Sequence, residues 1–150
     1  MITKIIRKKR ADILKSRDIK KIVDFVSGEE EYFSGEIVIT IVNDKLIREI
    51  NRDYLDRDKS TNVISFSYIE DFDEKISPVI SEIFINIDAA AREAKEVDIT
   101  TKDRAFQLII HGVLHGFGYE HVGVDKETAG KMFQKEVLYY NKLNEILKYE

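Results

Sequence analysis

Every histidine of this 150-residue chain lies in one short segment, HGVLHGFGYEH, which spans residues 111–121. His111 and His115 are four residues apart, and side chains at this spacing project from the same face of a helix. Two imidazole nitrogens that converge in this way suit a zinc ion, which binds histidine at ~2.0–2.1 Å. The pair therefore predicts two ligands of one metal ion.

The third histidine, His121, is too far along the chain to continue the same helical stripe. Gly118 precedes it, and glycine favours the left-handed conformation that ends many helices. We expect the helix to end near Phe117 and the chain to fold back, so that His121 reaches the same ion. A lone histidine on an apolar helix is usually a core residue, but three at this spacing indicate a metal site.

The residue types also bear on what the metal does. Structural zinc is usually closed by four protein ligands, mostly cysteine, and this chain has no cysteine. Three histidines leave a fourth position open for water unless Glu120 or Asp125 closes it. An open position favours a hydrolytic centre, because zinc lowers the pKa of bound water to about 7.

The histidine spacing is that of the zinc peptidase pattern HExxHxxGxxH. Gly112 stands where those peptidases have their general-base glutamate, so the metal ligands are present and the peptidase base is not. Gly112 and Gly116 also place two glycines inside the predicted helix, each costing about 1 kcal/mol relative to alanine. They indicate room for a substrate or for a closely packed backbone.

Hydrophobic periodicity predicts the elements that must position this segment. β-branched and alternating runs predict strands at 2–8, 35–42, 63–69 and 82–87, with a polar loop at 70–77. Helical spacing predicts helices at 16–27, from Asn43 or Asp44 onward, after Asp88, at 101–117 and at 125–148. About four strands and about five helices predict a single twisted sheet packed by helices, in one domain over residues 1–150.

Several residues are candidates for helix ends. Ser16 is a candidate N-cap and Gly28 a candidate stop for the first helix. Asp88 is a candidate N-cap for the short helix that follows it, and Thr100 or Thr101 for the histidine-bearing helix.

Composition narrows the classes of protein. Without cysteine, neither disulfides nor a thiolate site can form, and no apolar run approaches the ~20 residues of a membrane span. The N-terminus does not resemble a secretion signal, so we expect a cytoplasmic protein. A net charge of −4 argues mildly against a dedicated nucleic-acid binder, although residues 4–10 form a basic run that could contact phosphates.

HGVLHGFGYEH resembles the signature of the YbeY family of bacterial endoribonucleases. INRDYLDRDKSTNVISF, residues 50–66, and EIFINID, residues 82–88, resemble two further motifs of that family. The resemblance implies an α+β fold with a single mixed β-sheet and one zinc ion on His111, His115 and His121. It also implies a single-strand-specific endoribonuclease that acts on precursor ribosomal RNA at the small subunit, in 16S rRNA 3′-end maturation and ribosome quality control.

Other residues of this chain match the family's motifs less completely. Thr61, Asn62 and Ser65 match the second motif, and we expect Asn62 and Ser65 to contact substrate. The family commonly has an arginine that is important for activity where this chain has Leu55. Arg57 is the candidate to supply the guanidinium instead, and Arg52 is the other possibility.

Strand alternation separates the aromatic and hydroxyl residues of the second motif. If Phe66 packs in the core, Ser65 and Ser67 point the other way, toward the cleft. Two rival functions stay open: a zinc metallohydrolase acting on a peptide or small molecule, and a non-catalytic ribosome-associated protein with structural zinc.

Overall fold

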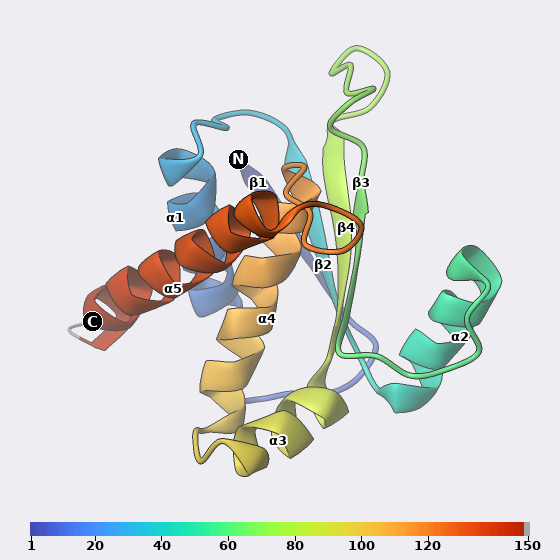
Figure 1. Ribbon diagram of the computed structural model, residues 1–150, viewed down its shortest axis with the longest axis vertical. Coiled ribbons are helices and arrows are strands. Elements are labelled where there is room, and N and C mark those ends of the chain that lie inside the picture. Colours follow the sequence, from blue (N-terminus) through green and yellow to red (C-terminus); the bar gives the residue numbers. More distant parts are fainter. Residues whose placement is uncertain (149–150) are drawn as a thin grey trace.

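The computed structural model describes residues 1–148, and within that range it has one four-stranded sheet and five helices (Figure 1). The strands are β1 (Ile2–Arg7), β2 (Glu36–Val42), β3 (Val63–Ser67) and β4 (Val79–Asn86). The helices are α1 (Ser16–Glu29), α2 (Asp44–Leu55), α3 (Ile87–Glu96), α4 (Thr101–Gly116) and α5 (Lys126–Lys148). The expected α+β fold with one mixed sheet is confirmed.

The sheet has the strand order β1-β2-β4-β3. Strands β1, β2 and β4 run parallel, so the chain must cross over between them, and α1 lies on the first crossover. Strand β3 runs antiparallel to β4, to which it is joined by the loop that contains residues 70–77. This loop extends beyond the end of the sheet (Figure 1). The two edges of the sheet are therefore β1 and β3.

One face of the sheet carries the main hydrophobic core. Helices α1 and α4 pack on this face, and α5 crosses over α4 (Figure 1). Strand β2, which pairs with β1 and β4, is buried along its whole length. The fully buried side chains are mainly branched and aliphatic: Ile19, Ile22, Val23, Val26, Ile37, Ile39, Ile41, Ile83, Ile85, Ile109, Val113 and Leu114. Although α4 is largely buried, no helix within residues 1–148 is long and apolar enough to span a membrane.

The opposite face carries a smaller apolar cluster under α2. Its buried members are Val42, Ile47 and Ile64, and Phe66 and Phe84 pack against them half-buried. Because side chains alternate along a strand, Ile64 and Phe66 of β3 face α2, whereas the residues that alternate with them face α4. Phe66 packs against this smaller cluster but stays half-buried, so the expectation that it is a core residue is met only in part.

Three helix ends differ from the sequence expectation. Helix α1 continues past Gly28 to Glu29, and the left-handed residue after it is Glu31, with a φ of 63°. Ser16 lies inside α1 and Lys15 is its cap residue. Asn86, not Asp88, caps α3, because its side-chain oxygen accepts hydrogen bonds from the Asp88 and Ala89 N–H groups.

Two other caps agree with the expectation. The Asn43 side chain accepts a hydrogen bond from Leu46 N–H at the start of α2. The Thr100 hydroxyl accepts one from Asp103 N–H at the start of α4, at 3.1 Å. Each cap satisfies one of the backbone donors that a helix leaves unpaired at its first turn, so the start of α4, and with it the phase of the histidines, is well defined.

Candidate metal centre

Helix α4 presents His111 and His115 side by side. Both imidazoles are half-buried, and their Nε2 atoms lie 3.0 Å apart. The ring planes are inclined at 78°, with ring centroids 4.5 Å apart. The helical spacing alone brings the pair together, as expected from the sequence.

The end of α4 brings the third histidine to the pair. Phe117 is the cap residue, and Gly118 follows it with a φ of 102°, which is in the left-handed region that glycine tolerates. The N–H groups of Gly118 and Tyr119 bond back to the carbonyls of the last helical turn, at 2.9 and 3.1 Å. The ring of His121 then lies 4.9 Å from the His111 ring and 4.8 Å from the His115 ring. The expected glycine turn is confirmed.

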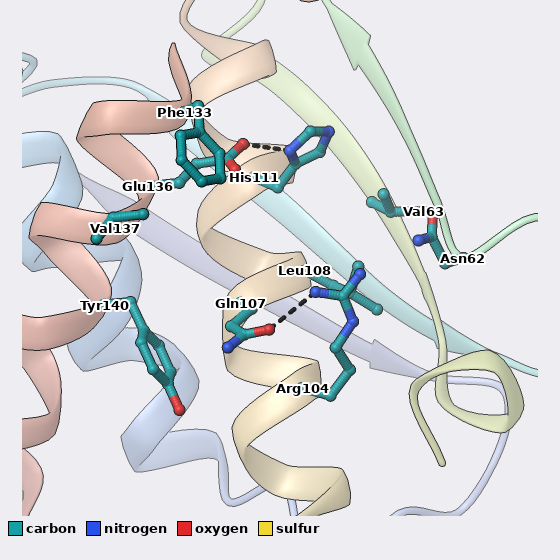
Figure 2. A pocket seen from close by; sticks show the side chains of 10 residues that line it. All are labelled: Asn62, Val63, Arg104, Gln107, Leu108, His111, Phe133, Glu136, Val137 and Tyr140. Atoms are coloured by element: carbon teal, nitrogen blue, oxygen red, sulfur yellow. Dashed lines mark hydrogen bonds and ion pairs between the residues drawn. The ribbon is translucent and has the colours of Figure 1, made fainter. Parts of the chain in front are cut away.

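The Nδ1 atoms of the helical pair are held by other groups. His115 Nδ1 donates a hydrogen bond to the backbone carbonyl of Tyr119 at 2.6 Å. His111 Nδ1 contacts the carboxylate of Glu136 on α5 (Figure 2). A carboxylate or carbonyl on the far nitrogen is the usual partner of a metal-binding histidine, because it fixes the tautomer and the orientation of the ring.

The geometry fits a bound cation. With Nδ1 protonated on both rings, the two Nε2 lone pairs face each other at 3.0 Å, and a cation between them turns this repulsion into coordination. Within residues 1–148 the cluster of possible ligand atoms consists of three histidine nitrogens, all within 4.8 Å of one another. Three nitrogens and no thiolate suit zinc.

The protonation of His115 also suits a ligand. Burial, followed by the neighbouring His111, lowers the pKa of His115 from 6.5 to about 4. The imidazole is therefore neutral at pH 7, which is the form that binds a metal.

Neither acidic candidate joins the histidine cluster. The Asp125 carboxylate accepts a hydrogen bond from Thr128 N–H at 2.8 Å, at the start of α5. Glu120 lines the cleft beside the histidines but is not grouped with their ligand atoms. Among the described residues, no fourth protein ligand is therefore grouped with the three histidines.

The histidines lie in a cleft of about 690 Å³ between α4, β3 and the end of α2. Arg57, Asn62 and Ser65, the three candidates for catalysis or substrate binding, all line this cleft, and so do Leu55 and Lys59. Arg52 does not line it, and its guanidinium pairs with Asp53 at 2.9 Å. Arg57 is therefore the better of the two arginine candidates.

Asn62 and Ser65 already have partners within the protein. The Ser65 hydroxyl donates to the Gly112 carbonyl at 2.9 Å, and Ser67 makes the same contact with Gly116 at 2.8 Å. The Asn62 amide donates to Glu93 at 3.2 Å. Ser65 and Ser67 thus face α4 and not α2, as the strand alternation predicts, and they attach β3 to the helix that carries the histidines.

The glycines of α4 allow this close approach. A Cβ atom on Gly112 would lie 2.6 Å from Ile83 Cγ2, and one on Gly116 would lie 2.6 Å from Ser81 Oγ. Both distances are shorter than side chains tolerate. Of the two roles expected for these glycines, close packing of the backbone against β4 is the one that the structure supports.

The basic run at residues 4–10 lies far from the cleft. It belongs to β1 and the turn after it, at the sheet edge opposite β3. Lys4 pairs with Glu36 at 3.3 Å, and Arg7 donates to the Leu14 carbonyl at 2.6 Å. No residue of this run lines the cleft, so its expected contact with substrate phosphates is not supported.

Residue type and spacing identify neither Glu136 nor the Tyr119 carbonyl as partners of the histidines. Glu136 is 25 residues from His111, and its place depends on how α5 crosses α4. No local pattern around Glu136 distinguishes it from the other acidic residues of α5. The Tyr119 carbonyl is a backbone atom, which residue type does not reveal.

Comparison with known proteins agrees with this arrangement. The model of the family described as Endoribonuclease YbeY matches residues 4–144. A relative in Syntrophotalea carbinolica named Endoribonuclease YbeY is 37% identical over 128 residues, 85% of each chain, and one in Geobacter sulfurreducens is 38% identical over 122 residues, 81% of each chain. The solution structure of a Thermotoga maritima protein shares the fold, with a TM-score of 0.69 at 20% identity over 99% of this chain and 93% of that one. The chain therefore belongs to the endoribonuclease YbeY family.

Proposed function

We propose that this protein is a zinc-dependent, single-strand-specific endoribonuclease that works as one hydrolase domain in the cytoplasm. Its substrate is precursor ribosomal RNA on the ribosomal small subunit, in 16S rRNA 3′-end maturation and ribosome quality control. The name of its relatives supports RNA cleavage. The observation that carries zinc dependence is the convergence of three imidazoles, two of which have their Nδ1 atoms held by other groups.

A zinc ion on His111, His115 and His121 would supply a Lewis acid that polarises a phosphoryl oxygen and lowers the pKa of water to about 7. Glu136 and the Tyr119 carbonyl keep two of the rings oriented before substrate arrives. Such preorganisation reduces the reorganisation that the reaction would otherwise require.

Other residues of the cleft suit an RNA strand. Arg57 and Lys59 line the same cleft as the histidines, and their positive groups suit a phosphodiester there. The ring of Tyr68 is 42% exposed at the same cleft and offers a surface for an unpaired base. An unpaired base can turn toward such a ring, whereas a paired base cannot, and this favours single-stranded substrate.

The test compares substrates and metal states in one assay. Zinc-loaded protein, EDTA-treated protein and His115→Ala receive a labelled single-stranded RNA, the same RNA in a duplex, and casein. We expect cleavage of single-stranded RNA only, loss of cleavage with EDTA, recovery on adding zinc, and no activity in His115→Ala. Full cleavage by metal-free protein would contradict zinc dependence, and cleavage of casein would favour a peptidase.

The chemistry of the RNA ends distinguishes two routes. Attack by the RNA 2′-OH leaves a 2′,3′-cyclic phosphate, whereas attack by water opens the phosphodiester without a cyclic product. Mass spectrometry of the fragments separates these results.

The folding of the metal-free protein addresses the remaining rival, a non-catalytic protein with structural zinc. The main core is built by the sheet with α1, α4 and α5, and the histidines are not part of it. We therefore expect EDTA-treated protein to keep its circular dichroism spectrum and its cooperative unfolding. Collapse of the fold on chelation would favour a structural zinc.

A further inference from the structure

A second cavity lies on the α5 side of His111 (Figure 2). It has a volume of about 380 Å³, near the lower end of the range for small-molecule pockets, which is roughly 300–1,000 Å³. His111, Asn62 and Val63 line both this cavity and the histidine cleft. The two spaces are therefore neighbours, on either side of a candidate metal ligand, and one RNA strand is long enough to contact both.

The walls of this second cavity differ in chemistry. Helix α5 supplies Phe133, Val137 and Tyr140, which form an apolar and aromatic wall, and α4 supplies Arg104 and Gln107 (Figure 2). Phe133 is 65% exposed and lines this cavity, so its ring is available to a ligand. An aromatic ring beside polar side chains is the combination that binds a nucleobase, because the ring stacks and the polar groups meet the edge of the base.

The charges in the cavity disfavour a phosphate group. The guanidinium of Arg104 already pairs with Glu93, at 2.8 Å, so its charge is neutralised within the protein. The Glu136 carboxylate also lies in the cavity and would repel an anion. A neutral base fits this environment better than a phosphate does.

Gln107 is arranged to meet the edge of a base. Its Oε1 atom accepts a hydrogen bond from Arg104 at 2.8 Å, which fixes the orientation of the amide (Figure 2). The amide nitrogen points away from Arg104 and has no hydrogen-bond partner among residues 1–148. Its two N–H groups are therefore free to donate to an acceptor on a base edge.

We propose that this cavity binds one unpaired nucleobase of the RNA strand, next to the phosphate that lies at the histidines. Phe133 stacks on the base, and Gln107 donates a hydrogen bond to its edge. This inference rests on the proposed endoribonuclease function and adds a base subsite to it.

The test measures RNA binding separately from cleavage. A fluorescein-labelled single-stranded oligoribonucleotide is titrated with the full chain in EDTA, and fluorescence anisotropy gives the Kd. We expect Phe133→Ala to weaken binding by roughly 5- to 100-fold, the range expected for loss of one stacked base. Leu138→Ala is the matched control, because Leu138 is a similarly exposed apolar residue of α5 that does not line the cavity. We expect this control to bind like the wild type.

A scan with abasic nucleotides locates the base. One abasic position should weaken binding to the wild type, and the same position should weaken binding to Phe133→Ala less, because this variant has already lost the stacking and retains only the Gln107 hydrogen bond. Gln107→Ala should weaken binding at that position without changing zinc content.

Three results would overturn the subsite. Phe133→Ala could bind RNA as tightly as Leu138→Ala, or the abasic scan could show no position-specific loss, and RNA cleavage would then stand without a base subsite. If the wild-type chain neither bound nor cleaved any RNA, the proposed function would fail together with the subsite.

Discussion

The candidate metal centre has two halves that are positioned in different ways. His111 and His115 lie on a capped, largely buried helix, and each has its Nδ1 atom held by a second group. His121 lies on an exposed segment after a glycine turn, and within residues 1–148 no hydrogen bond holds its ring. The helical half is therefore held by the protein alone, whereas the loop half is positioned by the turn; we expect a bound ion to order it further.

Because of this difference, we expect the helical pair and His121 to contribute unequally to the affinity for a metal ion. The helical pair is already ordered in the folded protein, so little further conformational entropy is lost there when a metal binds. The third ligand must be ordered when the metal binds. Each of the following changes tests whether the two halves contribute unequally.

The largest expected effect is the loss of a helical ligand. His115→Ala should reduce retained zinc to an undetectable level, because it removes one nitrogen of the preorganised pair. His121→Ala should keep weak zinc binding through His111 and His115. Zinc per protein, measured by inductively coupled plasma mass spectrometry after gel filtration, distinguishes the two variants. Equal zinc loss in both variants would show that the helical pair and His121 contribute equally to zinc binding.

A smaller effect is expected from the carboxylate that holds His111. Glu136→Gln removes the negative charge beside Nδ1 and should weaken zinc binding by roughly 10- to 100-fold. Competition with a fluorescent chelator measures the affinity. Glu145→Gln is the control, since Glu145 is an exposed acidic residue of the same helix. Unchanged affinity in Glu136→Gln would show that the helical half does not depend on α5.

The glycine turn tests the loop half. Gly118→Ala places a Cβ on a residue with a φ of 102° and should destabilise the protein by about 1 kcal/mol, with weaker zinc binding through His121. Gly130→Ala is the matched control, because Gly130 lies in α5, has no positive φ, and a Cβ there meets nothing within 4 Å. It should be neutral or slightly stabilising. Urea unfolding measures both variants, and a neutral Gly118→Ala would contradict the turn.

The smallest effect is expected for Glu30, which connects the end of α1 to α5. Burial opposes the charge of Glu30, but hydrogen bonds from Lys135, at 2.7 Å, and Tyr139, at 2.5 Å, hold its pKa below the ordinary 4.5. A carboxyl whose pKa is lowered by folding stabilises the protein above its ordinary pKa and loses that contribution as pH falls below it. Acidification from pH 5 to pH 3 should therefore destabilise the wild type more than Glu30→Gln, in urea unfolding at each pH. Parallel pH dependence in the two proteins would contradict this.

The sequence predicted those parts of the site that are local along the chain. The histidine pair follows from helical spacing, and the return of His121 follows from Gly118, because both depend only on neighbouring residues. The strands were predicted for the same reason, because a run of β-branched residues is a local signal of a buried strand. Strand β4 starts at Val79, three residues earlier than expected, which shows how weakly the sequence defines where a strand begins.

The parts that could not be predicted depend on distant segments. Glu136 reaches His111 only because α5 crosses α4, and Asn86 caps α3 while its amide also donates to Asp44 of α2. Gly28 was taken as a helix stop from residue type alone, but glycine permits a stop without requiring one. The glycines of α4 acquire a meaning only once β4 is known to lie against them.

The contact of Gly112 with Ile83 has a consequence for the history of this scaffold. A glutamate at residue 112 would complete the peptidase motif, yet its side chain would begin 2.6 Å from an isoleucine methyl group of β4. In Gly112→Glu, either Ile83 or the backbone of α4 would have to shift to accommodate the new side chain. A glutamate base at this position would thus need a smaller side chain at residue 83 as well, so the two surfaces would have to change together.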